Sequence, residues 1–308
     1  MKLLELENEF IDTYPYAGHH FNGQKSQRYI FNVKRINKPV EATAYHQQLN
    51  GKTIKVAVEL SSSYGCPVRC KFCASGALGP VQNLLESEIV EQALFIVKKI
   101  EKNVPIHFCY QGIGEPSILS DTILKASKKL SKKFPNAKFK FSTMGFRPNE
   151  VIKLISSDIP WLAVQITFPH YKQEKLREIF QGAVNYKIDK VFEMVKEIKR
   201  INPKLKIKFN YILIDGFNNN KSCFKNTIKT LRANGITLDD QTEIKISFLN
   251  PTDIASIHNL KSAKVINHYD LYKYAKKELK VKNIYVFGAM KNIKVGCGQL
   301  IYDKQKGK

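Results

Sequence analysis

Residues 61–73 read Ser-Ser-Ser-Tyr-Gly-Cys-Pro-Val-Arg-Cys-Lys-Phe-Cys, which gives Cys66, Cys70 and Cys73 the spacing C-x3-C-x2-C. Three thiolates on one short loop can bind three irons of a cubane four-iron cluster. The next cysteine in the chain is Cys109, so no neighbouring thiolate binds the fourth iron, which stays open to a substrate. The stretch therefore predicts an iron–sulfur centre with one open coordination site.

Two simpler explanations of these cysteines remain, an incomplete zinc site and a chance cluster. Zinc sites usually pair two C-x2-C motifs or add histidines at regular spacing. His107 and His170 are distant in the sequence and form no such pattern with the cysteines. Disulfide bonds are unusual in cytosolic proteins. Metal or redox chemistry is therefore the favoured interpretation.

The 308-residue chain carries 50 Lys and Arg against 27 Asp and Glu, a net charge of +23. Such an excess favours a polyanionic partner, and nucleic acid first. A Lys-rich proteome that uses Lys wherever a solvated charge is needed offers another explanation. The lysines gather on the exposed faces of two expected helices, at Lys125, Lys128, Lys129, Lys132 and Lys133 and at Lys273, Lys276, Lys277 and Lys280. The charge thus supports RNA or DNA binding without proving it.

The sequence shows no sign of a membrane-bound or secreted protein. No apolar run approaches the roughly 18 residues that a membrane span requires. Met1–Phe10 is acidic and amphipathic, whereas a secretory signal has a basic region followed by an apolar core. We therefore expect a cytoplasmic monomer with no membrane association.

Apolar patterning along the chain predicts strands that alternate with helices. β-branched and aromatic residues favour strands at 28–33, 40–45 and 53–60, with turn signals between them. Helical spacing of apolar residues begins after the cysteines, at Ile89. The expected strands then cover 106–111, 137–142, 161–167, 205–214, 243–249 and 283–287, and the expected helices cover 120–133, 148–157, 187–201, 222–234 and 261–279.

Strands separated by helices form βα units, and consecutive βα units build a parallel sheet. Counting the strand before Cys66, the pattern contains six such units. Six are too few for a closed eight-stranded barrel but enough for an open, partial one. The predicted fold class is therefore α/β, a partial (β/α)6 barrel at 53–308 with a small, largely β N-terminal extension at 1–52.

A second motif at residues 112–116, Gly-Ile-Gly-Glu-Pro, follows the expected strand 106–111. Glycines there let the backbone approach a ligand closely. Polar residues also stand at the ends of later strands, namely Ser142, Thr167 and Asn250. Barrel active sites are built at the carboxyl ends of the strands. Taken singly, each residue could equally be a loop cap or a turn residue.

The cysteine spacing, with the aromatic Phe72 directly before the last cysteine, resembles the motif of the radical S-adenosylmethionine superfamily. The resemblance implies a [4Fe-4S] cluster on Cys66, Cys70 and Cys73, with S-adenosylmethionine (SAM) chelated to the open iron by its amino and carboxylate groups. Electron transfer, from a donor such as flavodoxin or ferredoxin, then splits SAM into methionine and a 5′-deoxyadenosyl radical. The resemblance also implies the partial barrel that the alternation of strands and helices predicts.

The Gly-Ile-Gly-Glu-Pro turn resembles the place where that superfamily binds the methionine amino group of SAM. Gly114 and Glu115 are therefore the implied binding residues. Ser142, Thr167 and Asn250, at the ends of later strands, complete the predicted cofactor-binding set.

Five segments narrow the resemblance to the radical rRNA adenine methyltransferases. The segments are Ser61–Cys66, the Gly-Ile-Gly-Glu-Pro turn, Ser-Thr-Met-Gly at 142–145, Phe-Leu-Asn-Pro at 248–251 and Gly-Cys-Gly-Gln-Leu at 296–300. They occur in the order of that family and roughly at its spacing, and the match covers roughly residues 28–303. The family methylates carbon 2 or carbon 8 of an adenine in 23S rRNA, and one branch also modifies tRNA.

The C-terminal segment implies how a methyl group would be transferred. In the family, one SAM methylates the cysteine of Cys-Gly-Gln-Leu, and a second SAM supplies the radical that abstracts hydrogen from the S-methyl group. The resulting carbon radical adds to the adenine. The match to Cys297 implies this carrier role, with a buried structural cysteine as the simpler alternative. Glu41 matches a position assigned as a proton acceptor, with an exposed strand residue as the alternative.

The chain departs from that family in three places. The family has a second essential cysteine seven residues before the first cluster ligand, where this chain has Glu59, and neither Cys109 nor Cys223 aligns with it. Thr-Phe-Pro at 167–169 replaces the family's Ser-Leu-His turn. We also expect most of the family's N-terminal helical domain to be missing. If Cys297 forms a covalent adduct, Glu59 must act as a base by another route, or the chemistry ends differently.

The sequence predicts a radical SAM methyltransferase that acts at an unactivated carbon through Cys297, with adenine in rRNA or tRNA as the first substrate. Glu41 and Glu59 are the other catalytic candidates. One alternative is a relative recruited to a small molecule or a peptide, with or without methyl transfer, which Glu59 and the missing domain favour. The weaker alternative is a basic RNA-binding protein whose cluster is structural.

Overall fold

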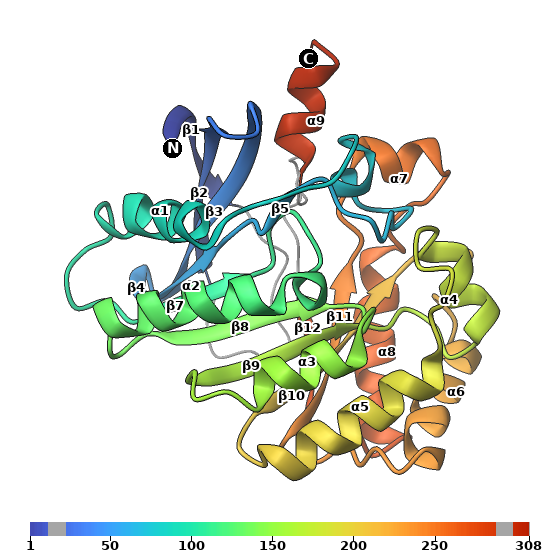
Figure 1. Cartoon of the computed structure of the whole chain (residues 1–308). Helices are drawn as coiled ribbons and strands as arrows, with labels where there is room; N and C mark the ends of the chain where they lie inside the picture. The colour runs from blue at the N-terminus through green and yellow to red at the C-terminus, as the bar shows by residue number, and fades with distance from the viewer. Residues whose placement is uncertain (12–22, 288–297, 308) are drawn as a thin grey trace.

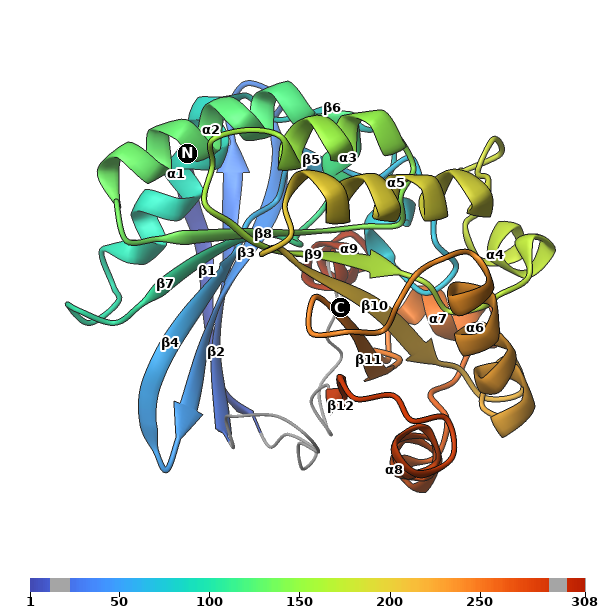
Figure 2. The same cartoon turned by 90° about the horizontal axis from the view of Figure 1, so that it is seen from below.

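The computed structural model describes residues 1–11, 23–287 and 298–307, which form one curved sheet with helices on its outer side (Figures 1 and 2). The strands of this sheet are β1 (Lys2–Ile11), β2 (Gly23–Val33), β3 (Lys38–Leu49), β4 (Lys52–Glu59), β7 (Ile106–Tyr110), β8 (Lys138–Thr143), β9 (Trp161–Thr167), β10 (Lys206–Leu213), β11 (Thr242–Phe248) and β12 (Ile284–Phe287). They lie side by side in this same order.

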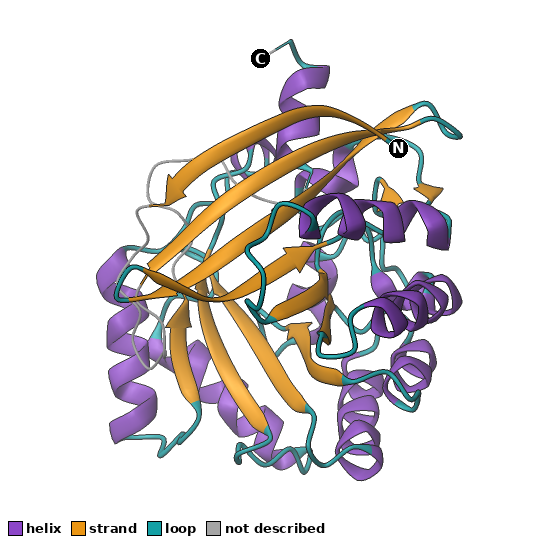
Figure 3. Cartoon of the chain, turned by 90° about the vertical axis from the view of Figure 1, so that its left-hand side faces the viewer, coloured by secondary structure: helices purple, strands orange, loops and turns teal. Residues whose placement is uncertain are grey.

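The sheet has an antiparallel part and a parallel part. β1 to β4 pair antiparallel, and from β4 through β7 to β12 every neighbouring pair of strands is parallel. Within the described residues β1 and β12 are the two edges and do not pair, so the sheet curls without closing (Figure 3). The α/β class and the open partial barrel expected from the sequence are thus confirmed.

Helices connect the parallel strands and cover the outer face of the sheet (Figure 2). The bounds of these helices are α1 (Glu86–Val97), α2 (Ser120–Lys133), α3 (Pro148–Ile155), α4 (Gln173–Ile179), α5 (Ile188–Ile201), α6 (Lys221–Ala233) and α8 (Val265–Lys277). Two short helices, α7 (Asp253–Ile257) and α9 (Gln299–Gln305), lie beside the segment that follows the cysteines (Figure 1). Two 3-10 turns, η1 (Ala74–Ala77) and η2 (Pro116–Ile118), and a small ribbon of β5 (Ser63–Tyr64) with β6 (Gln82–Asn83) lie in the connections. None of the described helices is both long and apolar enough to cross a membrane.

The helices form because one stripe of each is apolar. In α2, Ile123, Ala126 and Leu130 recur at a spacing of three to four residues and are fully buried. The five lysines that the sequence analysis placed on the opposite face are exposed, as are the four in and just after α8. Beneath the helices, the outer face of the sheet is aromatic, and the rings of Phe141 and Trp161 pack edge to face at 5.2 Å.

The inner face of the parallel strands is polar. In β8, the buried Phe139 and Phe141 alternate with the partly exposed Lys140 and Ser142, so one face of the strand is apolar and the other is polar. Parallel strands that are covered on both faces usually read as continuous apolar runs. The alternation therefore shows that these strands enclose something other than an apolar core.

The predicted strands and helices are confirmed to within a few residues, and the helix expected at 261–279 is α8 (Val265–Lys277), which is shorter at both ends. The sequence analysis missed β1, α4, α7 and α9. The boundary between 1–52 and 53–308 stays a prediction, and β3 pairs with β4 across it, Thr43 opposite Glu59, in one continuous sheet.

Candidate active site

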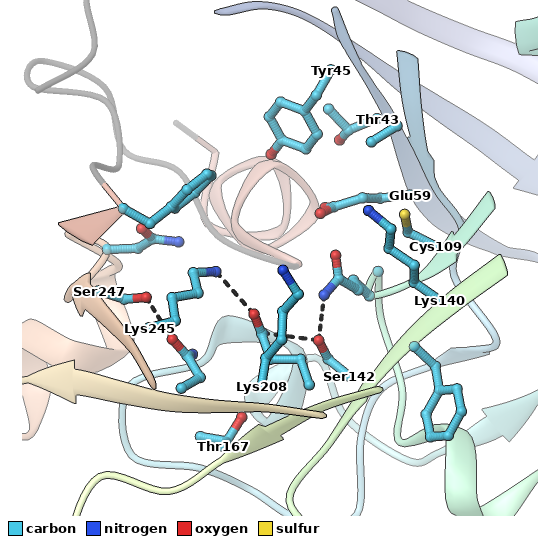
Figure 4. Close-up of a pocket in the computed structure, with 18 of the residues that line it drawn as sticks. Thr43, Tyr45, Glu59, Cys109, Lys140, Ser142, Thr167, Lys208, Lys245 and Ser247 are labelled. Atoms are coloured by element: carbon cyan, nitrogen blue, oxygen red, sulfur yellow. Dashed lines mark hydrogen bonds between the residues drawn. The ribbon is translucent and has the colours of Figure 1, made fainter. Parts of the chain in front are cut away.

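The inner side of the curved sheet holds a cavity of about 500 Å³ (Figure 4). Strands β2 to β4 and β7 to β12 contribute its walls. Phe72 and Cys73 of the cysteine loop lie at the end where the parallel strands finish, as does Leu300 of α9. The carboxyl ends of the strands thus face the cysteines, as expected for a barrel active site.

The cysteine loop is held by hydrogen bonds to a segment far along the chain. The N–H of Lys71 donates to the carbonyl of Ile179 at 3.0 Å, and the N–H of Gly182 donates to the carbonyl of Val68 at 2.8 Å. Thr252 donates from its hydroxyl to the carbonyl of Phe72 at 3.0 Å. The loop therefore has a fixed conformation that does not depend on the cysteine side chains.

The three thiols of the loop share a partly buried environment. Burial raises the pKa of each thiol, and for Cys66 and Cys70 the neighbouring thiols raise it further. Backbone N–H groups act in the opposite direction on the pKa values of all three, among them those of Val68 and Arg69 on Cys66 and those of Ser75 and Gly76 on Cys73. Three thiols that repel one another as thiolates, yet face N–H donors, suit a positively charged metal centre that offsets the repulsion.

The thiols of the described residues do not form a site for a single metal ion. Across residues 1–11, 23–287 and 298–307, no three His, Cys, Asp or Glu side chains lie close enough together to hold one metal ion. In a cubane cluster each thiolate binds a different iron, so its ligands lie farther apart than the ligands of one ion.

The Gly-Ile-Gly-Glu-Pro turn packs directly against the segment that leads into the cysteine loop. Gly114 has φ +120°, and a Cβ there would clash with the hydroxyl of Ser62 and lie 2.6 Å from that of Ser63. The N–H groups of both serines donate to the carbonyl of Ile113, at 2.9 and 3.2 Å. Only glycine fits this position, because a side chain would separate the turn from the loop.

Glu115 is buried and its carboxylate is engaged within the protein. It accepts hydrogen bonds from the hydroxyl of Thr143, from both the N–H and the hydroxyl of Ser117, and from the N–H of Met144 at 3.3 Å. Burial raises the pKa of Glu115, and these bonds lower it. Its charge also raises the pKa values of Cys66 and Cys70, which places it near the cysteine loop.

A network of polar side chains runs across the cavity wall at the strand ends. The hydroxyl of Ser142 accepts hydrogen bonds from the amides of Gln111 and Gln165, the latter at 2.9 Å, and Gln165 in turn accepts from the ammonium of Lys245 at 3.0 Å (Figure 4). Thr167 and Asn250 line the same cavity. The structure thus brings together the three strand-end residues that the sequence analysis selected.

The C-terminal segment returns to the cysteine loop. Cys297 itself lies outside the described residues. Its neighbour Gly298 has φ +84°, and a Cβ there would lie 2.8 Å from the backbone nitrogen of Ser75, so the two backbones are in contact. The N–H of Gly298 donates to the carboxylate of Glu41. Gln299 is fully buried and accepts from the N–H of Asp253 at 3.1 Å.

Glu41 and Glu59 both line the cavity. Glu41 is only 6% exposed, so the alternative of an exposed strand residue is wrong. The pKa of Glu59 is raised to about 7, and burial is the largest cause. The charge of Glu41 also acts to raise this pKa, while the charges of Lys245 and Lys140 act to lower it. A carboxyl group with such a pKa exchanges its proton near neutral pH.

Residues 60–239 match the family model of the radical SAM superfamily. The chain belongs to the radical SAM superfamily. The match begins directly before the serines that lead into the cysteine loop and extends beyond α6. It therefore spans the cysteines, the Gly-Ile-Gly-Glu-Pro turn and most of the parallel strands. Members of this superfamily bind a [4Fe-4S] cluster and SAM, and the enzyme is a radical SAM enzyme.

Two curated relatives of this radical SAM enzyme bear the same family name. The dual-specificity RNA methyltransferase RlmN of Oleidesulfovibrio alaskensis is 27% identical over 252 residues, which cover 78% of this chain and 66% of that protein. The probable dual-specificity RNA methyltransferase RlmN of Fervidobacterium nodosum is 27% identical over 198 residues, 63% of this chain and 54% of that protein. The chain thus spans between about half and two thirds of the length of these relatives.

Solved structures share the radical SAM fold. A radical SAM methyltransferase from Sphaerobacter thermophilus aligns with a TM-score of 0.76 at 17% identity, over 94% of this chain and 80% of that chain. A spore photoproduct lyase complexed with dinucleoside spore photoproduct aligns with a TM-score of 0.52 at 11% identity, over 74% of this chain and 75% of that chain. At these identities the likeness concerns the fold alone.

The donor set of this radical SAM enzyme fits the cluster. Cys66, Cys70 and Cys73 supply three thiolates, and the N–H groups that face them can stabilise cluster-bound sulfurs. The assignment of Gly114, Glu115, Ser142, Thr167 and Asn250 to SAM stays a prediction. For Glu115 the structure adds a positioning role, because its carboxylate joins η2 to the end of β8.

Sequence reasoning missed the lysines of the cavity wall. Lys140, Lys208 and Lys245 line the cavity from three different strands. The sequence did carry a signal for them, since Lys-Phe-Lys-Phe-Ser at 138–142 and Lys-Ile-Lys-Phe-Asn at 206–210 alternate with period two. In a strand flanked by helices, such alternation indicates that the inner face is polar.

Proposed function

We propose that this radical SAM enzyme methylates an unactivated carbon, with adenine in RNA as the first substrate, and that Cys297 carries the methyl group. The two relatives with which it shares 27% identity are named as RNA methyltransferases. The observation that carries the proposal is the place of Gly298. This neighbour of Cys297 contacts Ser75, only two residues beyond the cluster ligand Cys73.

In this proposal the residues of the site have separate tasks. When bound, the cluster and SAM supply the 5′-deoxyadenosyl radical. Cys66, Cys70 and Cys73 hold the cluster. Glu41 positions the C-terminal segment by accepting the hydrogen bond from Gly298. Glu59, with a pKa of about 7, is the better proton acceptor, because it lines the cavity and changes protonation at physiological pH.

The charge of the chain supports an RNA substrate. The net charge is +23, and the lysines of α2 and α8 are exposed on the outer side of the molecule. Such surfaces attract a polyanion from a distance. We further propose a cytoplasmic monomer that receives electrons from a donor such as flavodoxin or ferredoxin.

Three successive measurements test this function. The enzyme, purified anaerobically and reduced in the presence of SAM, should form 5′-deoxyadenosine. Peptide mass spectrometry of protein made in cells should find Cys297 methylated, and a bare thiol in active enzyme would remove the carrier role. Digested RNA from cells with wild-type enzyme should contain a methyladenosine that is missing from cells with Cys297→Ala. The buried Cys223→Ala in α6 is the matched control and should retain the product.

A second candidate function is supported by Glu59. This residue stands where the RNA-modifying family has its second essential cysteine, and the structure places it in the cavity. The enzyme would then act on a small molecule or a peptide. Formation of 5′-deoxyadenosine together with unchanged RNA in cells would favour this candidate, and a Cys297-dependent methyladenosine would exclude it.

A further inference from the structure

The floor of the cavity concentrates positive charge. Lys140, Lys208 and Lys245 each precede by two residues a polar side chain that also lines the cavity, namely Ser142, Asn210 and Ser247 respectively. Two residues of a strand span about 7 Å, so each of these three lysines, which we call the lysine layer, lies about 7 Å deeper than the polar residue of its own strand. Lys55 of β4 and Lys206 of β10 also line the cavity.

The described part of the chain does not balance these charges. Five lysines and two acidic side chains of the described residues line the cavity, namely Lys55, Lys140, Lys206, Lys208 and Lys245 against Glu41 and Glu59. Lys208 forms an ion pair with Glu243 at 2.9 Å. No ion pair within the described residues joins Lys55, Lys140 or Lys245 to an acidic group. The ranges 12–22 and 288–297, which the structure does not describe, contain a single acidic residue, Asp12.

The ammonium groups point toward a common space. Figure 4 shows the side chains of Lys140, Lys208 and Lys245 directed into the same cavity as Glu59. Burial and mutual repulsion lower the pKa of Lys245 to about 7, and they also lower the pKa of Lys140. Gathering ammonium groups in a partly buried site costs free energy unless an anion offsets it.

We propose that this lysine layer binds a phosphate group of the substrate. Lysine ammonium groups bind phosphate as point charges. A phosphate monoester carries close to two negative charges at neutral pH, which the surplus of basic side chains more than balances. The hydroxyl and amide groups of the strand ends lie one layer above, where they can contact the sugar and the base. The site assigned here deepens the proposed function and rests on it for the identity of the base.

Binding of inorganic phosphate tests the layer without a base. The holoenzyme, purified anaerobically in chloride buffer, should gain thermal stability in a saturable manner as phosphate is added. Lys140→Met keeps the length of the side chain and removes the charge, and it should weaken phosphate binding about tenfold or more. The matched control Lys229→Met removes an exposed charge from α6 and should leave the response unchanged. An equal response in Lys140→Met and wild type would overturn the proposal.

Stability in the absence of phosphate gives a second readout. If Lys140 is an unbalanced charge, Lys140→Met should raise the melting temperature in chloride buffer by about 2 °C or more. A melting temperature of Lys140→Met below that of wild type would show that Glu59 already balances the charge of Lys140. That result would contradict the proposed surplus of positive charge in the cavity. Lys245→Met and Lys140→Gln repeat the test should Lys140→Met fail to fold.

Three ligands distinguish the source of the phosphate. AMP should bind about tenfold more tightly than adenosine if the site takes a terminal monoester, and this difference should vanish in Lys140→Met. If ApA binds more tightly than adenosine and AMP binds no more tightly than ApA, the site takes a phosphodiester of a longer RNA. Equal binding of all three would overturn the assignment to phosphate.

The outcomes for the two proposals are separable. A phosphate response in an enzyme that leaves cellular RNA unmodified would retain the lysine site and exclude the RNA substrate. A Cys297-dependent methyladenosine from an enzyme whose stability does not respond to phosphate would support the RNA substrate and exclude the lysine site.

Discussion

The two ends of the cavity are held in place by different means. At the cysteine end, backbone groups make the decisive contacts, such as Lys71 to Ile179 at 3.0 Å and Gly298 against Ser75. At the floor of the cavity, which the lysines form, side chains make the contacts. Within the described residues, the ammonium of Lys245 donates a hydrogen bond to the side-chain oxygen of Gln165. One end is built from backbone conformations and the other from charge.

This difference decides what each end tolerates. A backbone contact requires a particular residue, because glycine alone fits where a Cβ would strike a neighbouring backbone. A charged wall requires only a charge of the right sign, so it can change without loss of the fold. We therefore infer that the cysteine end fixes how the reaction starts, and that the floor selects the substrate. Four substitutions test this contrast.

The largest effect is expected at the cysteine end, from Cys70→Ala. Loss of one of three thiolates should abolish stable cluster binding, because each thiolate holds its own iron. Iron and sulfide content and the visible absorbance of the reconstituted protein measure this loss. Cys223→Ala in α6 is the control, and equal iron content in the two variants would contradict the assignment of the ligands.

Gly298→Ala should have the next largest effect. A left-handed conformation costs an alanine about 1 kcal/mol, and the clash with Ser75 adds about 1–3 kcal/mol. The expected result is local loosening of α9, measured by hydrogen exchange of its amides.

Gly51→Ala separates the two contributions. Gly51 has φ +79°, close to that of Gly298, but a Cβ there meets nothing within 4 Å. It should therefore show the conformational cost alone. Equal effects of the two substitutions would mean that the contact with Ser75 contributes nothing.

Glu59→Gln should change how stability depends on pH. The folded protein raises the pKa of Glu59 from 4.5 to about 7, so it keeps a proton that the unfolded chain has already lost. The stability that this provides is complete below pH 4.5 and is lost as the pH rises to about 7. Glu59→Gln should therefore exceed wild type in free energy of unfolding by up to about 3 kcal/mol at pH 8, and by little at pH 4.5.

Denaturant unfolding at the two pH values measures this difference. Glu193, exposed on α5 in an ion pair with Lys190 at 2.7 Å, provides the control. Its pKa is lowered, so Glu193→Gln should show a difference of the opposite sign. A pH-independent difference between Glu59→Gln and wild type would contradict the raised pKa.

The smallest of the four effects is expected for Glu41→Ala. It removes the acceptor for the N–H of Gly298, and a hydrogen bond to a charged group contributes about 1.5–3 kcal/mol. Hydrogen exchange at Gly298 should accelerate, whereas Glu41→Gln keeps an acceptor oxygen and should stay closer to wild type. If Glu41→Ala protects Gly298 as well as wild type, Glu41 does not position the C-terminal segment.

The same contrast explains how much the sequence could reveal. The cysteine loop and the Gly-Ile-Gly-Glu-Pro turn were found because backbone constraints leave fixed residues at fixed spacing, as at Gly114. Strands such as β8 and β9 were placed well because their periodicity is regular. The roles of Glu41 and Glu59 could not be separated in this way, because burial and distance to Gly298 depend on the folded structure.

The errors have physical causes as well. The N-terminal strand β1 was missed because Glu and Asn are depleted in strands, although Leu4–Glu7 alternates apolar and charged residues, and it is an edge strand that pairs only with β2. The helix α7 was missed because it has only five residues, too few to show a helical period, although Thr252 caps it by accepting from the N–H of Ala255. Lys140 and Lys245 were missed, although the period-two alternation of β8 and β11 places them on the polar face of each strand.

The hydrogen bonds of the cysteine loop also bear on the biosynthesis of the protein. The loop is completed by Gly182, Thr252 and Gly298, which the ribosome adds long after Cys73. At about 5–20 residues per second, the interval from Cys73 to Gly298 lasts roughly 10 to 45 s. During this time the thiols have neither their full set of contacts nor their final burial. Delivery of iron and sulfide is therefore a late step in maturation, which follows the addition of Gly298 to the chain.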